Sequence, residues 1–170
     1  MTNQIPRDWN VYRSWLDDDP AVFRLNLALN EVAPIEGFSY CVRITVELKN
    51  PDERGFSTDE ERPTIYVIED KIFRPLESNK DILVAVLTAR GEVTWYFYSQ
   101  APEHLQERLS ASWDSEFGYS YQVECSEDKQ WNFFLKGLYP NIYEKQTIYN
   151  RETLSACQEN DDQVEVPRPI

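Results

Sequence analysis

The sequence has few of the residues on which catalysis and metal binding usually depend. Its 170 residues include one histidine, three cysteines and five glycines. The cysteines (Cys41, Cys125 and Cys157) are odd in number and widely spaced, so neither a disulfide framework nor a zinc site is indicated. We expect them to be buried as small apolar side chains. The glycines are scattered singly, so the sequence has no glycine-rich phosphate loop.

Long apolar runs are also missing. No stretch approaches the roughly 18 consecutive apolar residues of a membrane span. The first seven residues contain no apolar segment of the kind found in secretory signals. We therefore expect a cytoplasmic protein with no membrane association.

Positive charge is scarce, because 17 lysines and arginines stand against 30 aspartates and glutamates, a net charge of −13. Such a field repels phosphate backbones, so we expect no nucleic-acid partner. The acidity favours solubility, and it also suits docking to a basic protein. The expected partner is a protein, and a basic partner and a homodimer both stay open at this point.

No catalytic constellation is predicted. The single histidine, His104, falls in the first turn of a helix that starts at Pro102, with an acid and a base three and four residues later. That spacing is typical of a solvated helix face. Asp17-Asp18-Asp19 lacks the spaced ligands of a calcium loop. We expect no catalytic residue, no metal and no cofactor. The alternative is a hydrolase or small-ligand enzyme that uses carboxylates in a cleft.

Periodicity predicts six strands, at residues 9–16, 21–29, 40–49, 82–89, 93–99 and 119–125. Helical spacing predicts helices at residues 62–74, 102–113, 131–138 and 142–157. From residue 40 onward the order is β-α-β-β-α-β, which predicts an α+β fold with a ferredoxin-like antiparallel sheet. An N-terminal β-hairpin is expected to extend this sheet beside residues 82–89, and helices follow at the C-terminal side. We predict a single α+β domain at residues 1–158 and an acidic tail or linker at residues 159–170.

One face of the predicted sheet meets the helices, and the other face points outward. The outward face is predicted to carry Arg24, Asn26, Arg43, Thr45, Glu47, Tyr96, Tyr98, Gln122 and Glu124. Arginine and tyrosine bury area at protein interfaces while keeping polar groups available. The candidate partner-binding residues are therefore Arg24, Arg43, Tyr96 and Tyr98. The N-terminal hairpin or the C-terminal helices could instead cover this face.

Several segments occur in an order that resembles one known family. They are Asp8-Trp9, residues 21–27, 43–51, 55–61, 68–70 and 96–98, and Trp131 with residues 138–140. Over residues 8–151 the chain is similar to the bacterial domain of unknown function 695 family. The resemblance implies no assigned activity and no functional residues. In many relatives a domain similar to the regulator of ribonuclease E activity, type B, follows, and residues 150–170 resemble the junction that leads into it.

These observations together predict a non-enzymatic, cytoplasmic protein-interaction module with a regulatory or inhibitory role. The prediction rests on the missing catalytic residues, the acidity and the arginine- and tyrosine-bearing sheet face.

Overall fold

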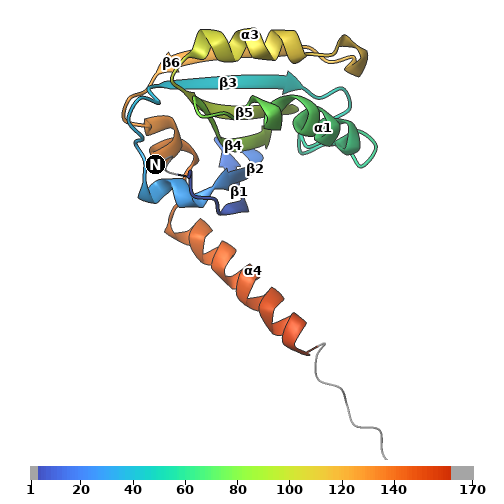
Figure 1. Ribbon diagram of the computed structural model, residues 1–170. Coiled ribbons are helices and arrows are strands. Elements are labelled where there is room, and N and C mark those ends of the chain that lie inside the picture. Colours follow the sequence, from blue (N-terminus) through green and yellow to red (C-terminus); the bar gives the residue numbers. More distant parts are fainter. Residues whose placement is uncertain (1–3, 162–170) are drawn as a thin grey trace, which may run out of the picture. The chain divides into compact units, whose positions relative to one another are not determined.

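The computed structural model describes residues 4–161 and divides the chain into two compact units, residues 1–139 and 140–170 (Figure 1). Within the described residues, the second unit consists mainly of the helix α4 (Ile142–Asp161). The predicted single domain at residues 1–158 spans both units and stays a prediction. Of the predicted tail, residues 162–170 lie outside the described residues.

The first unit has a mixed α+β fold built on an open, antiparallel six-stranded sheet. Its strands lie in the order β1-β2-β4-β5-β3-β6, which Figure 1 shows from bottom to top. The strand bounds are β1 (Trp9–Leu16), β2 (Asp19–Asn26), β3 (Tyr40–Glu47), β4 (Asp81–Ala89), β5 (Glu92–Ser99) and β6 (Tyr121–Glu127). β2 pairs with β4, which confirms that the N-terminal hairpin extends the sheet beside residues 82–89.

Two long helical segments and several short ones connect these strands or follow the last of them. They are η1 (Leu27–Glu31), α1 (Arg62–Ile68), η2 (Glu69–Phe73), α2 (Arg74–Leu76), α3 (Pro102–Ser112), η3 (Ser115–Phe117) and η4 (Phe133–Leu138). Both η2 and η4 are π-helical turns. Of the helices within residues 4–161, none combines the length and the apolar character needed to cross a lipid bilayer.

The helix that starts at Arg62 was predicted to end at Arg74, but it continues to Leu76. The backbone stays right-handed helical from Ile68 through Phe73 and Arg74, so α1, η2 and α2 form one continuous helical segment. Within it the Arg74 N–H group bonds to the carbonyl of Glu69, five residues earlier, and Pro75 follows directly after this π-helical turn.

The main core lies between one face of the sheet and the helices α1 and α3. Alternate residues of β3, Val42, Ile44 and Val46, are fully buried in this core. Trp95 of β5 stacks on Phe73 of η2, with the ring centroids 3.9 Å apart. This burial fixes which side of β3 and β5 faces the helices.

The opposite face of the sheet is partly covered by the segment that contains η4. Tyr98 of β5 stacks on Trp131 at a centroid distance of 4.0 Å. On β1, the hydroxyl of Tyr12 donates a hydrogen bond of 2.6 Å to the carbonyl oxygen of Leu138, and the Tyr12 ring stacks on Phe23 at 4.8 Å. The sheet is therefore covered on both faces around β4, as its continuous apolar pattern predicted.

Asp128 holds the η4 segment on the sheet. Asp128 is 7% exposed, and its carboxylate accepts hydrogen bonds from the Tyr98 hydroxyl at 2.7 Å and from the N–H groups of Asn132 and Phe133, each at 2.9 Å. Burial raises the pKa of Asp128, but the hydrogen bond from Tyr98 and the two backbone donors outweigh it. The net effect is a lowered pKa.

The turn between β4 and β5 holds a neighbouring loop in place. Arg90 and Gly91 form this two-residue turn with φ values of 55° and 77°, as a type I′ hairpin requires. The Gly91 N–H group donates a 3.0 Å hydrogen bond to the carbonyl oxygen of Gly55. A Cβ at Gly55 would come within 2.8 Å of the Gly91 nitrogen, and the φ of Gly55 is +81°. Only glycine lets the loop approach the turn this closely.

Replacing Asp128 by asparagine is expected to lower the free energy of unfolding by about 1–3 kcal/mol, because an amide cannot accept from all three donors. Urea denaturation at neutral pH measures the change. The matched control is Glu127→Gln, which alters an exposed carboxylate whose ion pair is with Lys129. Glu127→Gln is expected to change the free energy of unfolding by less than about 0.5 kcal/mol.

The same pair of variants tests the pKa of Asp128. Because the folded-state pKa is lowered, the carboxylate stabilises the fold above its ordinary pKa, and this stabilisation is lost as the pH falls through the folded-state pKa. Between about pH 5 and about pH 3, wild type should lose more stability than Asp128→Asn. Equal losses in the two proteins would contradict the assigned hydrogen bonds.

Candidate functional site

On β3, β5 and β6, the residues predicted to share the outward face do lie on one face of the sheet. Arg43 lies opposite Tyr96 of β5 and Glu124 of β6 in the strand register, so these three side chains share one face. In the next row Thr45 lies opposite Thr94 and Gln122. These residues line a concavity of about 290 Å³, which we call the sheet-face site.

Arg43 lies at the border of the sheet-face site and is held from two sides. Its guanidinium forms an ion pair of 2.5 Å with Glu124 and lies over the ring of Phe133, 5.1 Å from the centroid. The Arg43 side chain is 30% exposed. It therefore presents an edge to solvent, while its charge is balanced within the sheet.

Tyr96 lies between Arg43 and the β4 side of the sheet-face site. Burial raises the pKa of its hydroxyl, and the nearby positive charge of Arg43 opposes this shift only in part. Among the residues that the structure describes, none forms a hydrogen bond with this hydroxyl. A half-buried ring with an unused polar group is suited to contact a partner.

The rim of the sheet-face site is acidic. Arg90 donates hydrogen bonds of 2.7 Å to both Asp17 and Asp19, across the two hairpin turns. Both aspartates are therefore ion-paired with Arg90. In the described part of the chain, no three His, Cys, Asp or Glu side chains are grouped so as to hold a metal ion.

Tyr98 was predicted to face a partner, and its position contradicts this. It lies on the same face as Arg43, but it is 0% exposed because Trp131 and Phe134 cover it. On this half of the face, therefore, a C-terminal helical segment covers the sheet, which was the alternative to an open surface. Tyr98 stabilises the fold and cannot reach a partner directly.

Arg24 and Asn26 were also predicted on the Arg43 face, and both lie on the opposite face. Arg24 lies opposite Val86, whose side chain belongs to the helix-side core. Asn26 is buried and bonds to the N–H of Asp8 and the carbonyl of Pro6, each at 2.8 Å. The apolar residues of β2 pack under the η4 layer instead of under the helices, and this reverses the predicted assignment of faces.

The structure gives Arg24 a partner that the sequence analysis missed. Arg24 forms an ion pair with Glu69 of η2, and the Trp95 Nε1–H group donates a 3.1 Å hydrogen bond to the same carboxylate. Glu69 is 4% exposed. It stands four residues after Ile65 and three before Ile72, on the apolar stripe of its helix. A charged residue at that position was the available signal.

The structure also shows whether the histidine and two of the cysteines are buried or exposed. His104 is exposed on α3, as the spacing predicted. Cys41 is buried, as predicted, whereas Cys125 is exposed on the edge strand β6, so the prediction of burial was wrong for that residue. Burial raises the pKa of Cys41 to about 12, so its thiol stays protonated.

Arg24 and Arg43 offer a matched test of these placements. Arg24→Met is expected to lower the free energy of unfolding by about 3 kcal/mol, because it leaves the carboxylate of Glu69 buried without its main partner. Arg43→Met breaks a pair with the exposed Glu124 and should cost less than about 1 kcal/mol. Urea denaturation of both variants measures the difference. Similar costs would contradict the pairing of Arg24 with a buried carboxylate.

The family comparison agrees with the resemblance found in the sequence. A model described as a family of unknown function (DUF695) matches residues 7–139. The comparison with curated proteins and the comparison with solved structures each found no match. The matched segment contains the whole sheet and the sheet-face site. The chain therefore belongs to the DUF695 family.

Proposed function

We propose that this protein is a non-enzymatic, cytoplasmic interaction module that docks a basic protein on the sheet-face site. The observation that carries the proposal is an open concavity lined by Arg43, Tyr96 and Glu124 on a chain of net charge −13. Protein interfaces are enriched in tyrosine and arginine. A regulatory or inhibitory role would follow if docking covers a functional basic surface of the partner.

Charge decides the chemistry of the partner. The lining of the sheet-face site contributes two arginines, Arg43 and Arg90, and both are balanced by carboxylates of this chain. Arg90 alone engages two aspartates, and Glu92 adds a further negative charge to the lining. The site is therefore locally acidic within an acidic protein. A partner with lysines and arginines around its contact surface would be attracted and oriented.

Tyr96 is the proposed anchor of the interface. Its ring is already half-buried, so little conformational freedom is lost on binding, and its hydroxyl is available to a partner group. Binding energy concentrates in such tyrosines near the centre of an interface. The Arg43 guanidinium is held in place by Glu124 and Phe133, and its exposed edge is available to a partner.

We also propose that residues 40–127 form a ferredoxin-like core. Two observations support this arrangement. β5 lies between β3 and β4 and is antiparallel to both, as in a split β-α-β unit. In addition, α1 and α3 bury apolar side chains in the same core on one face of the sheet.

A pair of tyrosine variants tests the docking proposal. A photoreactive phenylalanine analogue at position 96 should crosslink to a basic protein in native cells, and the same analogue at the exposed Tyr66 of α1 should not. With the crosslinked partner purified, Tyr96→Ala should weaken binding at least about tenfold. Tyr66→Ala should change the affinity less than about twofold, and added salt should weaken the wild-type complex.

Three results would contradict the proposal. The first is equal weakening by the two alanine variants, and the second is a partner without a basic surface. The third is a wild-type homodimer that dissociates on Tyr96→Ala in sedimentation experiments, which would make a second copy of the chain the occupant.

The alternative, an enzyme with carboxylates in a cleft, has one supporting observation. Glu69 and Glu77 line a second cavity of about 270 Å³, and burial raises the pKa of Glu77. Both carboxylates are ion-paired, however, Glu77 with Arg7 and Glu69 with Arg24. This alternative requires turnover of a substrate that is lost in Glu77→Gln.

A further inference from the structure

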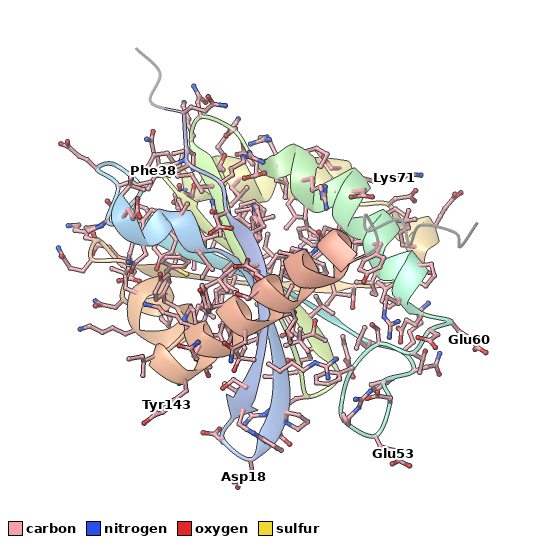
Figure 2. All side chains as sticks on the ribbon, turned by 90° about the horizontal axis from the view of Figure 1, so that it is seen from below. Asp18, Phe38, Glu53, Glu60, Lys71 and Tyr143 are labelled. Carbon is pink, nitrogen blue, oxygen red and sulfur yellow. The ribbon has the colours of Figure 1, made fainter. Side chains whose placement is uncertain are left out.

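A cavity of about 440 Å³ lies on the helix side of the sheet, away from the sheet-face site. It is bounded by the β1–β2 hairpin, by α1 and by the loop of residues 50–61. Figure 2 shows this loop, labelled at Glu53 and Glu60, next to the hairpin that turns at Asp18. The volume is within the range of small-molecule sites in proteins.

Arginines line this cavity from two walls. Arg13 of β1 and Arg24 of β2 come from the sheet, where the strand register places both on the helix side. Arg54 comes from the loop and Arg62 from the start of α1. Four of the eleven arginines of an acidic chain therefore meet at one cavity. We call it the arginine cavity.

Three of these arginines are held in place by neighbours. Arg54 makes hydrogen bonds of 3.2 and 2.8 Å to the carboxylate of Asp52. Arg62 bonds to Asp59 at 2.7 Å and to the carbonyl of Ser57 at 2.9 Å. Arg24 is fixed by its buried partner in η2. Such side chains need little reorganisation when a ligand arrives.

Arg13 differs from the other three. Its side chain is exposed, and within residues 4–161 it has no hydrogen bond or ion pair. Because guanidinium groups bind carboxylate and phosphate oxygens in pairs, Arg13 can contribute two new hydrogen bonds to a bound anion.

The floor and the remaining walls indicate what else the ligand contains. The apolar side chains of Val11, Val22, Ile65, Val86 and Val93 line the space between the arginines. The π-helical turn η2 begins at Glu69, which also lines the cavity. π-helical turns within α-helices occur frequently at functional sites.

We propose that the arginine cavity binds a small molecule that carries two anionic groups, carboxylates or phosphates, on a partly apolar body. Arginines from the sheet on one side and from the loop and α1 on the other suit an anionic group at each end, and the valines and Ile65 suit an apolar middle. The net charge of −13 opposes nucleic acids, whose many phosphates would meet the acidic surface around the cavity. A small dianion would lie among the four arginines, of which three are paired with carboxylates of this chain, and Arg13 supplies the positive charge that no described carboxylate balances.

Calorimetric titration of the whole protein tests this proposal with two probes that each carry two anionic groups on a short apolar chain, adipate for the carboxylate arm and 1,4-butanediol bisphosphate for the phosphate arm. At least one probe should bind saturably with one site per chain. The stronger of the two identifies the preferred anionic group.

Arg13→Gln is the diagnostic variant, because it removes the arginine that no described residue engages and should leave the thermal midpoint unchanged. It should weaken binding at least about tenfold, because a neutral amide cannot replace the two charge-assisted hydrogen bonds of a guanidinium. The control Arg151→Gln removes the same charge from an exposed position that does not line the cavity, and should change the affinity less than about twofold. Failure of both probes to bind would overturn the proposal, as would equal weakening by the two variants.

Discussion

The buried carboxylate of Glu69 is the interaction on which the arrangement of the first unit most depends. Glu69 is 4% exposed, and a carboxylate buried to this degree must be hydrogen-bonded and paired, or it would destabilise the fold by several kcal/mol. Arg24 supplies the charge from β2, and Trp95 supplies a donor from β5. One side chain of the helical layer is thereby tied to two strands that are not neighbours in the sheet.

The two proposed binding sites lie on opposite faces of the sheet, and the ion pair between Arg24 and Glu69 belongs to one of them. On the helix side, it fixes Arg24 in the wall of the arginine cavity. On the other side of the sheet, Arg43 and Tyr96 remain at the open sheet-face site, because the η4 segment covers only the part of that face around Tyr98. An acidic protein therefore presents a locally acidic surface on one face. On the other face it presents four arginines, of which three are paired with carboxylates and Arg13 is not. The two faces suit partners of opposite charge.

The sequence predicted the elements better than it predicted their contacts. Alternation with period 2 located the strands and put Arg43 and Tyr96 on one face, because side-chain direction along a strand is a local property. It could not say which layer β2 buries its apolar side against, and this choice moved Arg24 to the helix side. Tyr98 is buried by Trp131, a residue of a helical segment whose docking place depends on the tertiary fold. The arginine cavity combines residues 13, 24, 54 and 62, and no local pattern connects them.

The most direct test of this account is an NMR titration that follows the Nε–Hε signals of the arginine side chains as adipate or 1,4-butanediol bisphosphate is added. The account predicts that the signals of Arg13 and Arg24 shift saturably, while those of Arg43 and Arg151 stay in place. Equal shifts at all four arginines, or no shift at any of them, would contradict the existence of a specific anion site.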